Sequence, residues 1–285
     1  MSISRSERQI GELMKLREKL WIWGQDAGSH HAVGNNVWKL PGVNRLGPVE
    51  GCAYLGIPNC CRVVMNGLPV PPFDAEADRL DGMRSVVWSI IGDGGSVRNN
   101  ESTDLEEVIR IAKTHGNISG AIMDDFMNEK RMKLFPPERL AAMRERLHAA
   151  LEDRSLDLWS VLYCHELSEK AVPWLRQIDR VSLWAWCAEE FRDLEKNHAR
   201  LRELMADDPK PVLAGCYLFD YGGCRPMPMD LMKLQLDVYY RWLKDGTIDG
   251  IIFCSNTVAD IGLAAADYAR EWIAVHGDEE LPEKS

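Results

Sequence analysis

The sequence lacks several features that would place it in a well-defined class. Its eight cysteines contain no C-x-x-C pair, so a structural zinc site of the usual spacing has no support. No apolar run approaches the ~20 residues that a membrane-spanning helix needs. No G-x-G-x-x-G follows the first predicted strand, which argues against an open dinucleotide-binding sheet. The stretch "GDGGS" at 92–96 lacks the lysine and the spacing of a phosphate-binding loop.

The sequence also has fewer basic than acidic residues. Lysine and arginine number 34 against 44 aspartates and glutamates, which gives a formal net charge of -10. This charge repels a phosphate backbone and anionic lipid, so neither nucleic acid nor a membrane is an expected partner. The first twenty residues carry scattered charges and no continuous apolar core, so we expect no signal peptide, reduced thiols and a cytoplasmic location.

What the sequence does contain is a repeated alternation of short apolar runs and helical segments. Each run has the length of a strand and is followed by polar or glycine-rich residues. The runs cover residues 19–24, 61–67, 85–92, 119–126, 158–166, 180–187, 212–222 and 250–256. Helical spacing or helix-terminal residues are found in the segments 103–116, 136–153, 188–208, 229–246 and 258–277.

Eight strand and helix units predict an α/β chain that closes into a (β/α)8 TIM barrel. We expect a single domain over residues 1–285, with a short N-terminal helix at about 1–18 and a flexible C-terminal tail at about 277–285. Residues 25–80 are rich in glycine and proline and are expected to form long loops with broken helices.

A barrel of this kind has its active site at the carboxyl ends of its strands, so polar and aromatic residues that follow the apolar runs are candidates. Some have simpler explanations: Asp26, Asp93 and Asp220 suit turns, the pair Glu189 and Glu190 suits the start of a helix, and His30 and His31 suit a loop. The candidates for substrate binding are Trp23, Gln25, Asp26, Trp38, Asn66, Asp93, His165, Trp186, Asp220, Tyr221 and Asn256.

The candidates for catalysis are the carboxylates Asp124, Asp125 and Glu166. Each follows a strongly apolar strand, where a charge is costly unless a site uses it. Adjacent residues of a strand also point to opposite sides, so Asp124 and Asp125 should not share one structural partner. Carboxylates beside indole rings suit a sugar, which stacks its CH face on the ring and offers its hydroxyls to the acids. The pattern therefore favours glycoside hydrolysis, which needs an acid and a second group at the anomeric centre.

The stretch "GAIMDDF" at 120–126 resembles the end of strand four in barrel hexosaminidases of the O-GlcNAcase type. More broadly, the chain resembles barrel glycoside hydrolases. The resemblance implies substrate assistance, in which Asp124 orients the acetamido group of the substrate and Asp125 acts as general acid and then base. It implies a small carbohydrate substrate and no cofactor or metal.

Two other functions fit the same residues. A divalent-metal-dependent sugar isomerase or epimerase would use Asp124, Asp125, His165, Glu166 and Asp220 as hard oxygen and nitrogen ligands. A barrel that binds carbohydrate without catalysis would keep the aromatic walls alone. Bound metal would favour the isomerase, and binding without turnover would favour the binding protein.

Overall fold

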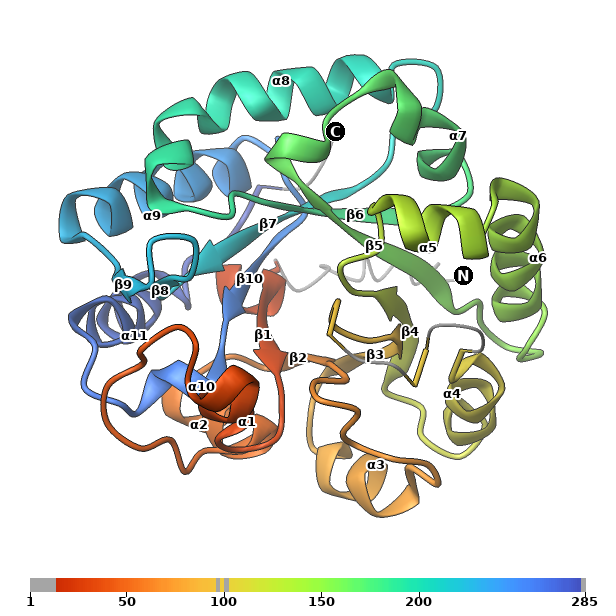
Figure 1. Cartoon of the computed structure of the whole chain (residues 1–285), viewed down its shortest axis with the longest axis horizontal. Coiled ribbons are helices and arrows are strands. Elements are labelled where there is room, and N and C mark those ends of the chain that lie inside the picture. The colour runs from red at the N-terminus through yellow and green to blue at the C-terminus, as the bar shows by residue number, and fades with distance from the viewer. Residues whose placement is uncertain (1–13, 96–97, 100–102, 283–285) are drawn as a thin grey trace, which may run out of the picture.

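The computed structural model describes residues 14–95, 98–99 and 103–282. In this part of the chain eight parallel strands close into a barrel (Figure 1), and each pairs with the strand that precedes and follows it in the chain. The first and last strands close the ring through the register Leu20 to Ile251. The strands are β1 (Leu20–Gly24), β2 (Asn59–Arg62), β3 (Ser85–Ile91), β4 (Ile118–Met123), β5 (Asp157–Tyr163), β6 (Arg180–Trp184), β7 (Val212–Tyr217) and β10 (Gly250–Cys254). The predicted (β/α)8 barrel is confirmed.

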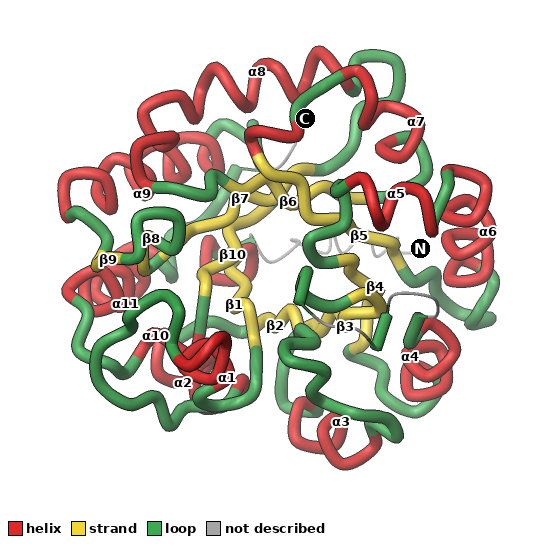
Figure 2. The backbone as a smooth tube through the Cα atoms, in the orientation of Figure 1, coloured by secondary structure: helices red, strands yellow, loops and turns green. Residues whose placement is uncertain are grey.

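Helices surround the barrel as an outer ring (Figures 1 and 2). Five of the predicted helical segments contain α4 (Leu105–Ala112), α6 (Pro137–His148), α8 (Leu194–Leu204), α9 (Met229–Lys244) and α11 (Ala264–His276). Helix α9 buries an apolar face that includes Leu236 and Leu243 and stops just before Gly246, whose φ of 76° is readily adopted by glycine. Shorter helices α5 (Glu129–Leu134) and α7 (Val172–Leu175) follow β4 and β5.

The early region is irregular, as its glycines and prolines predict. It contains the short helices α1 (Ser29–Ala32), α2 (Pro48–Leu55) and α3 (Asp74–Leu80) and the 3-10 turn η2 (Val33–Asn35). Further short elements are η3 (Cys164–Glu166), η4 (Glu169–Ala171), η5 (Ala188–Asp193), α10 (Asn256–Ala259) and the antiparallel pair β8 (Phe219–Asp220) and β9 (Arg225–Pro226). Several of these lie directly after strands, so they decide where strand-end side chains point.

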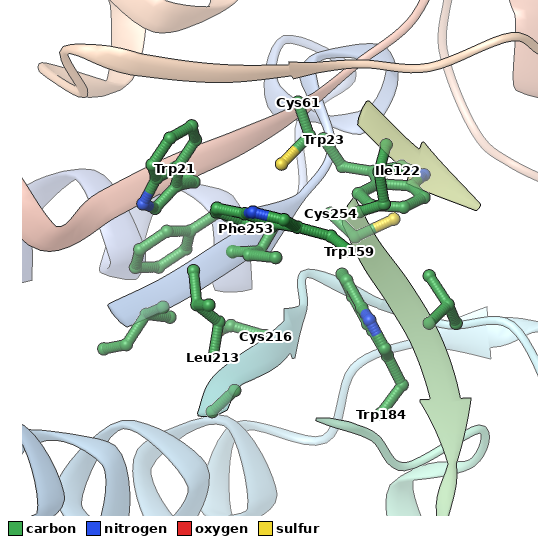
Figure 3. Packing of buried hydrophobic residues seen from close by; sticks show 14 of the residues in the cluster. Trp21, Trp23, Cys61, Ile122, Trp159, Trp184, Leu213, Cys216, Phe253 and Cys254 are labelled. Atoms are coloured by element: carbon green, nitrogen blue, oxygen red, sulfur yellow. The ribbon is translucent and has the colours of Figure 1, made fainter. Parts of the chain in front are cut away.

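The barrel interior is filled by large aromatic side chains (Figure 3). Trp21 packs against Trp159 with ring centroids 5.0 Å apart, and Trp23 packs against Trp184 at 5.3 Å, both edge to face. A Cβ atom at Gly215 would lie 2.0 Å from the Trp184 ring, so glycine is required there. These contacts fill the barrel core. Trp23 and Trp184 lie nearer the carboxyl ends of the strands and form the floor of the pocket described below.

The first and last described residues of the chain lie close together at the other side of the barrel. Most of the predicted N-terminal helix, residues 1–13, lies outside the described residues, and residues 16–19 form the 3-10 turn η1 (Leu16–Lys19). The predicted flexible tail is anchored as far as it is described. Leu281 is buried and donates its N–H to the carbonyl of Met14 at 2.8 Å, and Asp278 pairs with Arg17 at 2.9 Å. Among the described residues, no helix is both long enough and apolar enough to cross a membrane.

Candidate active site

A pocket of about 490 Å³ opens at the carboxyl ends of the barrel strands. Its lining is aromatic and acidic, and it draws on residues from all parts of the described chain. Predicted site residues that line it are Trp23, Gln25, Trp38, Asp93, Asp124, Asp125, Trp186 and Tyr221. The other lining residues are His30, Met65, Val161, Tyr163, Trp184, Tyr217 and Cys254. The location is the one in which (β/α)8 enzymes carry out their chemistry.

Both members of the adjacent aspartate pair line this pocket, contrary to the alternation expected of a strand. Strand β4 ends at Met123, so the pair lies in the bend that follows the strand. The N–H of Asp124 still donates to the carbonyl of Ile91 at 2.9 Å, but Asp125 adopts a φ of 43°. This left-handed conformation turns the chain, and the period of two no longer applies.

The two carboxyl groups have different partners. Asp125 accepts hydrogen bonds from the Tyr163 hydroxyl at 2.8 Å and from the N–H of Gly94 at 2.8 Å, one on each oxygen. Asp124 accepts the N–H of Asp125 at 2.9 Å on Oδ1, while its Oδ2 accepts no hydrogen bond from the described residues. Asp125 is therefore held by the ends of β3 and β5, and one oxygen of Asp124 is free to meet a ligand.

Burial controls the protonation of this cluster. The pKa of Asp124 is raised well above its usual range by burial and, less strongly, by the negative charges of Asp125 and Asp93, against the opposing effect of Arg131. Burial also raises the pKa of Asp93, although that carboxyl accepts the N–H groups of Asn66 and Gly95. The cluster thus favours a protonated carboxyl on Asp124, which is the form that a general acid requires.

Arg131, from α5, supports the cluster from behind. It is 2% exposed, and its guanidinium donates to the carbonyl oxygens of Gly92, Asp93 and Asp124. It therefore fixes the ends of β3 and β4 to each other. Nothing in the sequence points to this role, because the stretch "NEKRMKL" that contains the arginine has the pattern of an ordinary surface helix.

Aromatic side chains make most of the remaining wall. His30, predicted to be a simple loop residue, is 4% exposed, and its Nδ1 lies 2.7 Å from the hydroxyl of Tyr221. Burial lowers its pKa to about 3, so the ring is neutral. The sequence pattern does not single out Tyr163 and Tyr217, because both lie inside apolar runs and not after them. Both are the last residues of their strands, β5 and β7, and this position is a signal that could have found them.

Glu166 and His165, predicted to belong to the site, do not line the pocket. After Tyr163 the chain enters the 3-10 turn η3, and the Glu166 carboxylate accepts the N–H of Tyr163 at 2.9 Å. Both residues instead line a second hollow that also includes Trp174. The turn redirects them, so the apolar run before Glu166 does not place its carboxylate beside Asp124.

Four further predicted residues, Asp26, Asn66, Asp220 and Asn256, do not line the pocket, and each has structural partners. Asp26 pairs with the buried guanidinium of Arg62. Asn66 donates its side-chain amide to the carbonyl of Ser29 at 3.0 Å. Asp220 accepts the N–H of Gly223 at 2.9 Å and pairs with Arg225 at 2.8 Å, as a turn residue does.

Asn256 bridges the two strands that close the barrel. Its side chain accepts the N–H of Gln25 at 2.8 Å and donates to the carbonyl of the same residue at 2.8 Å. It therefore holds the end of β1 in place, and through it the loop that carries His30.

The ligand set proposed for a sugar isomerase is not assembled. Within residues 14–95, 98–99 and 103–282, no group of three or more histidine, cysteine, aspartate or glutamate side chains is placed to hold a metal ion. His165 and Glu166 line a different hollow from the aspartate pair, and Asp220 pairs with Arg225. The isomerase alternative therefore has no ligand set in this part of the chain.

No family model and no curated protein matches the chain. Its similarity to solved structures is in the fold. It is similar to a candidate alpha-L-fucosidase from Bacteroides thetaiotaomicron, with a TM-score of 0.58 and 11% identity over 98% of this chain and 100% of that one. It is also similar to a GH18 chitinase from Pseudoalteromonas aurantia, with a TM-score of 0.54 and 14% identity over 90% and 99%. A GH99 endo-alpha-mannosidase from Bacteroides thetaiotaomicron has a TM-score of 0.53 and 11% identity over 87% and 85%. These structural neighbours are glycoside hydrolases of several families, and they share the barrel with this chain.

Proposed function

We propose that the chain is a glycoside hydrolase that uses the carboxyl groups of Asp124 and Asp125 on a small carbohydrate. The observation that carries the proposal is the convergence of both carboxyls in an aromatic pocket at the carboxyl end of the barrel. Hydrolysis of a glycosidic bond needs one protonated and one ionised group at the anomeric centre. The similarity of the fold to several glycoside hydrolases adds to this argument.

The electrostatics favour a division of roles opposite to the one that the resemblance implies. Asp124 is buried and its pKa is raised, so it holds the proton that passes to the leaving oxygen as the C–O bond breaks. Asp125 receives two hydrogen bonds, and its carboxylate stabilises the positive charge that develops at the anomeric carbon. A water molecule then adds to that carbon and gives a proton back to Asp124, which restores the starting state. Tyr163 and the backbone of Gly94 hold that carboxylate in position.

The test is a screen of aryl glycosides, N-acetylhexosaminides included, followed by kinetics of Asp124→Asn and Asp125→Asn. General acid catalysis contributes ~10²–10⁴-fold, so Asp124→Asn should lose about this much on substrates with poor leaving groups and far less on those with very good ones. Asp125→Asn should lose activity on both kinds.

Glu166→Gln is the matched control, since its carboxylate lies outside the pocket and glutamine can still accept the N–H of Tyr163. Full activity in both aspartate variants, or loss in Glu166→Gln equal to theirs, would refute the proposal. If the loss of activity depends on the leaving group in Asp125→Asn and not in Asp124→Asn, then Asp125 is the general acid, as the resemblance implies.

A further inference from the structure

The second hollow, which has a volume of about 1050 Å³, lies between α5 and α7 (Figure 1). This volume is at the upper end of the roughly 300–1,000 Å³ of ligand pockets in proteins. Side chains from α5 (Met132 and Lys133), from the turn η3 (His165) and from α7 (Trp174) line it. They take no part in the chemistry proposed above, so the hollow needs a separate explanation.

A shared wall separates the hollow from the pocket that holds the aspartate pair. After β4, Asp125 lines the pocket and Met127 lines the hollow. After β5, Tyr163 lines the pocket and His165 lines the hollow, and their rings stack with centroids 5.5 Å apart and an interplanar angle of 10°. At this point two stacked rings separate the two spaces, so a chain-like ligand in the pocket can extend across their edges into the hollow.

Hydrogen bonds hold this wall in position. The Tyr163 hydroxyl donates to Asp125 at 2.8 Å, and the N–H of Tyr163 donates to the Glu166 carboxylate at 2.9 Å. Trp186, which is 36% exposed, packs edge to face against Tyr163 with ring centroids 5.9 Å apart. Trp186, Tyr163 and His165 therefore form a row of rings that runs from the pocket to the hollow. Aromatic rings of this kind are surfaces on which the CH face of a sugar stacks.

Trp174 is the largest apolar side chain of the hollow. Its ring is partly exposed, and its Nε1 donates to the carbonyl of Phe135 at 2.8 Å. This bond satisfies the single donor of the indole and fixes the orientation of the ring. A ring that is already fixed loses little conformational freedom when a ligand stacks on it. Met127 and Met132 add apolar surface around it.

The polar residues of the hollow carry charges of both signs. Lys133 and Lys170 are basic, Glu129 and Glu166 are acidic, and Ser168 contributes a hydroxyl. The formal charges of the lysines and glutamates cancel, which favours a neutral ligand over an anion or a cation. Hydrogen-bonding groups around an aromatic surface suit a ligand that has both CH faces and many hydroxyls, as a sugar does.

We propose that the second hollow binds further sugar units of the substrate. The substrate class is then a neutral oligosaccharide longer than a disaccharide, with one unit in the pocket, the next across Tyr163 and His165, and another on Trp174. The inference rests on the proposed hydrolase function for cleavage of the chain, whereas binding of the oligosaccharide stands independently of it.

The test is a binding screen of the full chain on an array of neutral glycans that contains mono-, di-, tri- and tetrasaccharides of each common sugar and linkage. Asp124→Asn is screened in parallel, so that hydrolysis does not shorten the glycans. Calorimetric titration then compares the members of the series that binds. We expect the tetrasaccharide to bind at least about tenfold more tightly than the disaccharide of the same sugar, since stacking on one more ring together with new hydrogen bonds brings a gain of this order.

Substitutions at Trp174 locate the gain. Trp174→Leu should bring the affinity for the tetrasaccharide to within about twofold of that for the disaccharide, whereas Trp174→Phe keeps a ring and should retain most of the difference. The matched control is Tyr268→Leu, which removes a partly buried ring on α11 that lines neither space and should leave the ratio unchanged. The comparison of glycan lengths on the unaltered chain stays informative even if Trp174→Leu fails to fold.

Equal affinity for the disaccharide and the tetrasaccharide would leave the hollow to another ligand and overturn the inference, as would the absence of binding to any glycan on the array. A preference for the tetrasaccharide that persists in folded Trp174→Leu would also overturn it. Length-dependent binding without hydrolysis of any glycoside would support this inference and refute the proposed hydrolase. Hydrolysis of an aryl glycoside with no gain from longer chains would do the reverse.

Discussion

Replacing Arg131 with methionine tests the reasoning about the site without any knowledge of the substrate. The guanidinium is 2% exposed and donates to three backbone carbonyls at the ends of β3 and β4. Methionine fills similar space but donates nothing, so three buried acceptors lose their partner at ~1–3 kcal/mol each. The three carboxyls also lose their nearby cation, and removal of one partner from a buried charged group typically costs ~3–5 kcal/mol.

The two contributions come from one guanidinium and do not add fully, so we take less than the sum of their lower ends and expect Arg131→Met to lower the free energy of unfolding by at least about 4 kcal/mol, a large share of the ~5–15 kcal/mol of a typical domain. The measurement is urea unfolding at pH 7, followed by tryptophan fluorescence. Arg131→Lys should lose less, because it keeps the charge but replaces the planar fork with a single ammonium.

The control is Arg146→Met, which removes an exposed arginine that pairs with Glu106 on the surface. Surface pairs contribute ~0–1 kcal/mol, so this variant should unfold close to the wild type. If the stability of Arg131→Met falls within about 1 kcal/mol of the control, the arginine does not hold the ends of β3 and β4 together.

Three further predictions follow from single side chains. Because burial raises the folded-state pKa of Asp124, the folded chain keeps a proton that the unfolded chain releases above its pKa of about 3.9. The contribution of Asp124 to the free energy of unfolding should therefore fall as pH rises from about 4 toward neutrality. Asp124→Asn removes that contribution, so its stability relative to the wild type should increase over this range and it should be the more stable protein at pH 7. Identical urea midpoints for the two proteins across this range would contradict the prediction. Tyr163→Phe removes the hydroxyl that binds Asp125 at 2.8 Å. The value of kcat/KM on an aryl glycoside should therefore fall about tenfold or more, with little loss of stability. A change in the unfolding midpoint without a change in kcat/KM would show that the tyrosine has only a structural role. Asn256→Ala breaks the hydrogen bonds to both backbone groups of Gln25. The free energy of unfolding, measured with heat or urea, should fall by ~2–4 kcal/mol. Unchanged stability would show that the end of β1 is held by other contacts.

The sequence was sufficient to predict the barrel because each strand and helix signal is local. A run such as 85–92 is mostly apolar, as strands buried on both faces require, and β3 occupies Ser85–Ile91. Capping and terminal residues of the later helices have the same local character. Eight repeats of such signals leave few ways to close a parallel sheet.

The position of the aspartate pair at the end of a strand could also be predicted, because the end of an apolar run can be read directly from the sequence. It could not orient residues beyond that point. The left-handed conformation of Asp125 turns both carboxyls into the pocket, and the 3-10 turn after Tyr163 takes Glu166 out of it.

Only the tertiary structure decided which distant residues complete the site. His30 meets Tyr221 across 191 positions of sequence, and Arg131 reaches the carbonyls of Gly92 and Asp93 from a separate helix. Such contacts depend on the closure of the barrel and on side-chain packing, and neither produces a periodic pattern in the sequence. The sequence by itself determined the barrel and the acidic strand end, whereas folding determined which side chains surround it, because burial and hydrogen bonding are properties of neighbours in space.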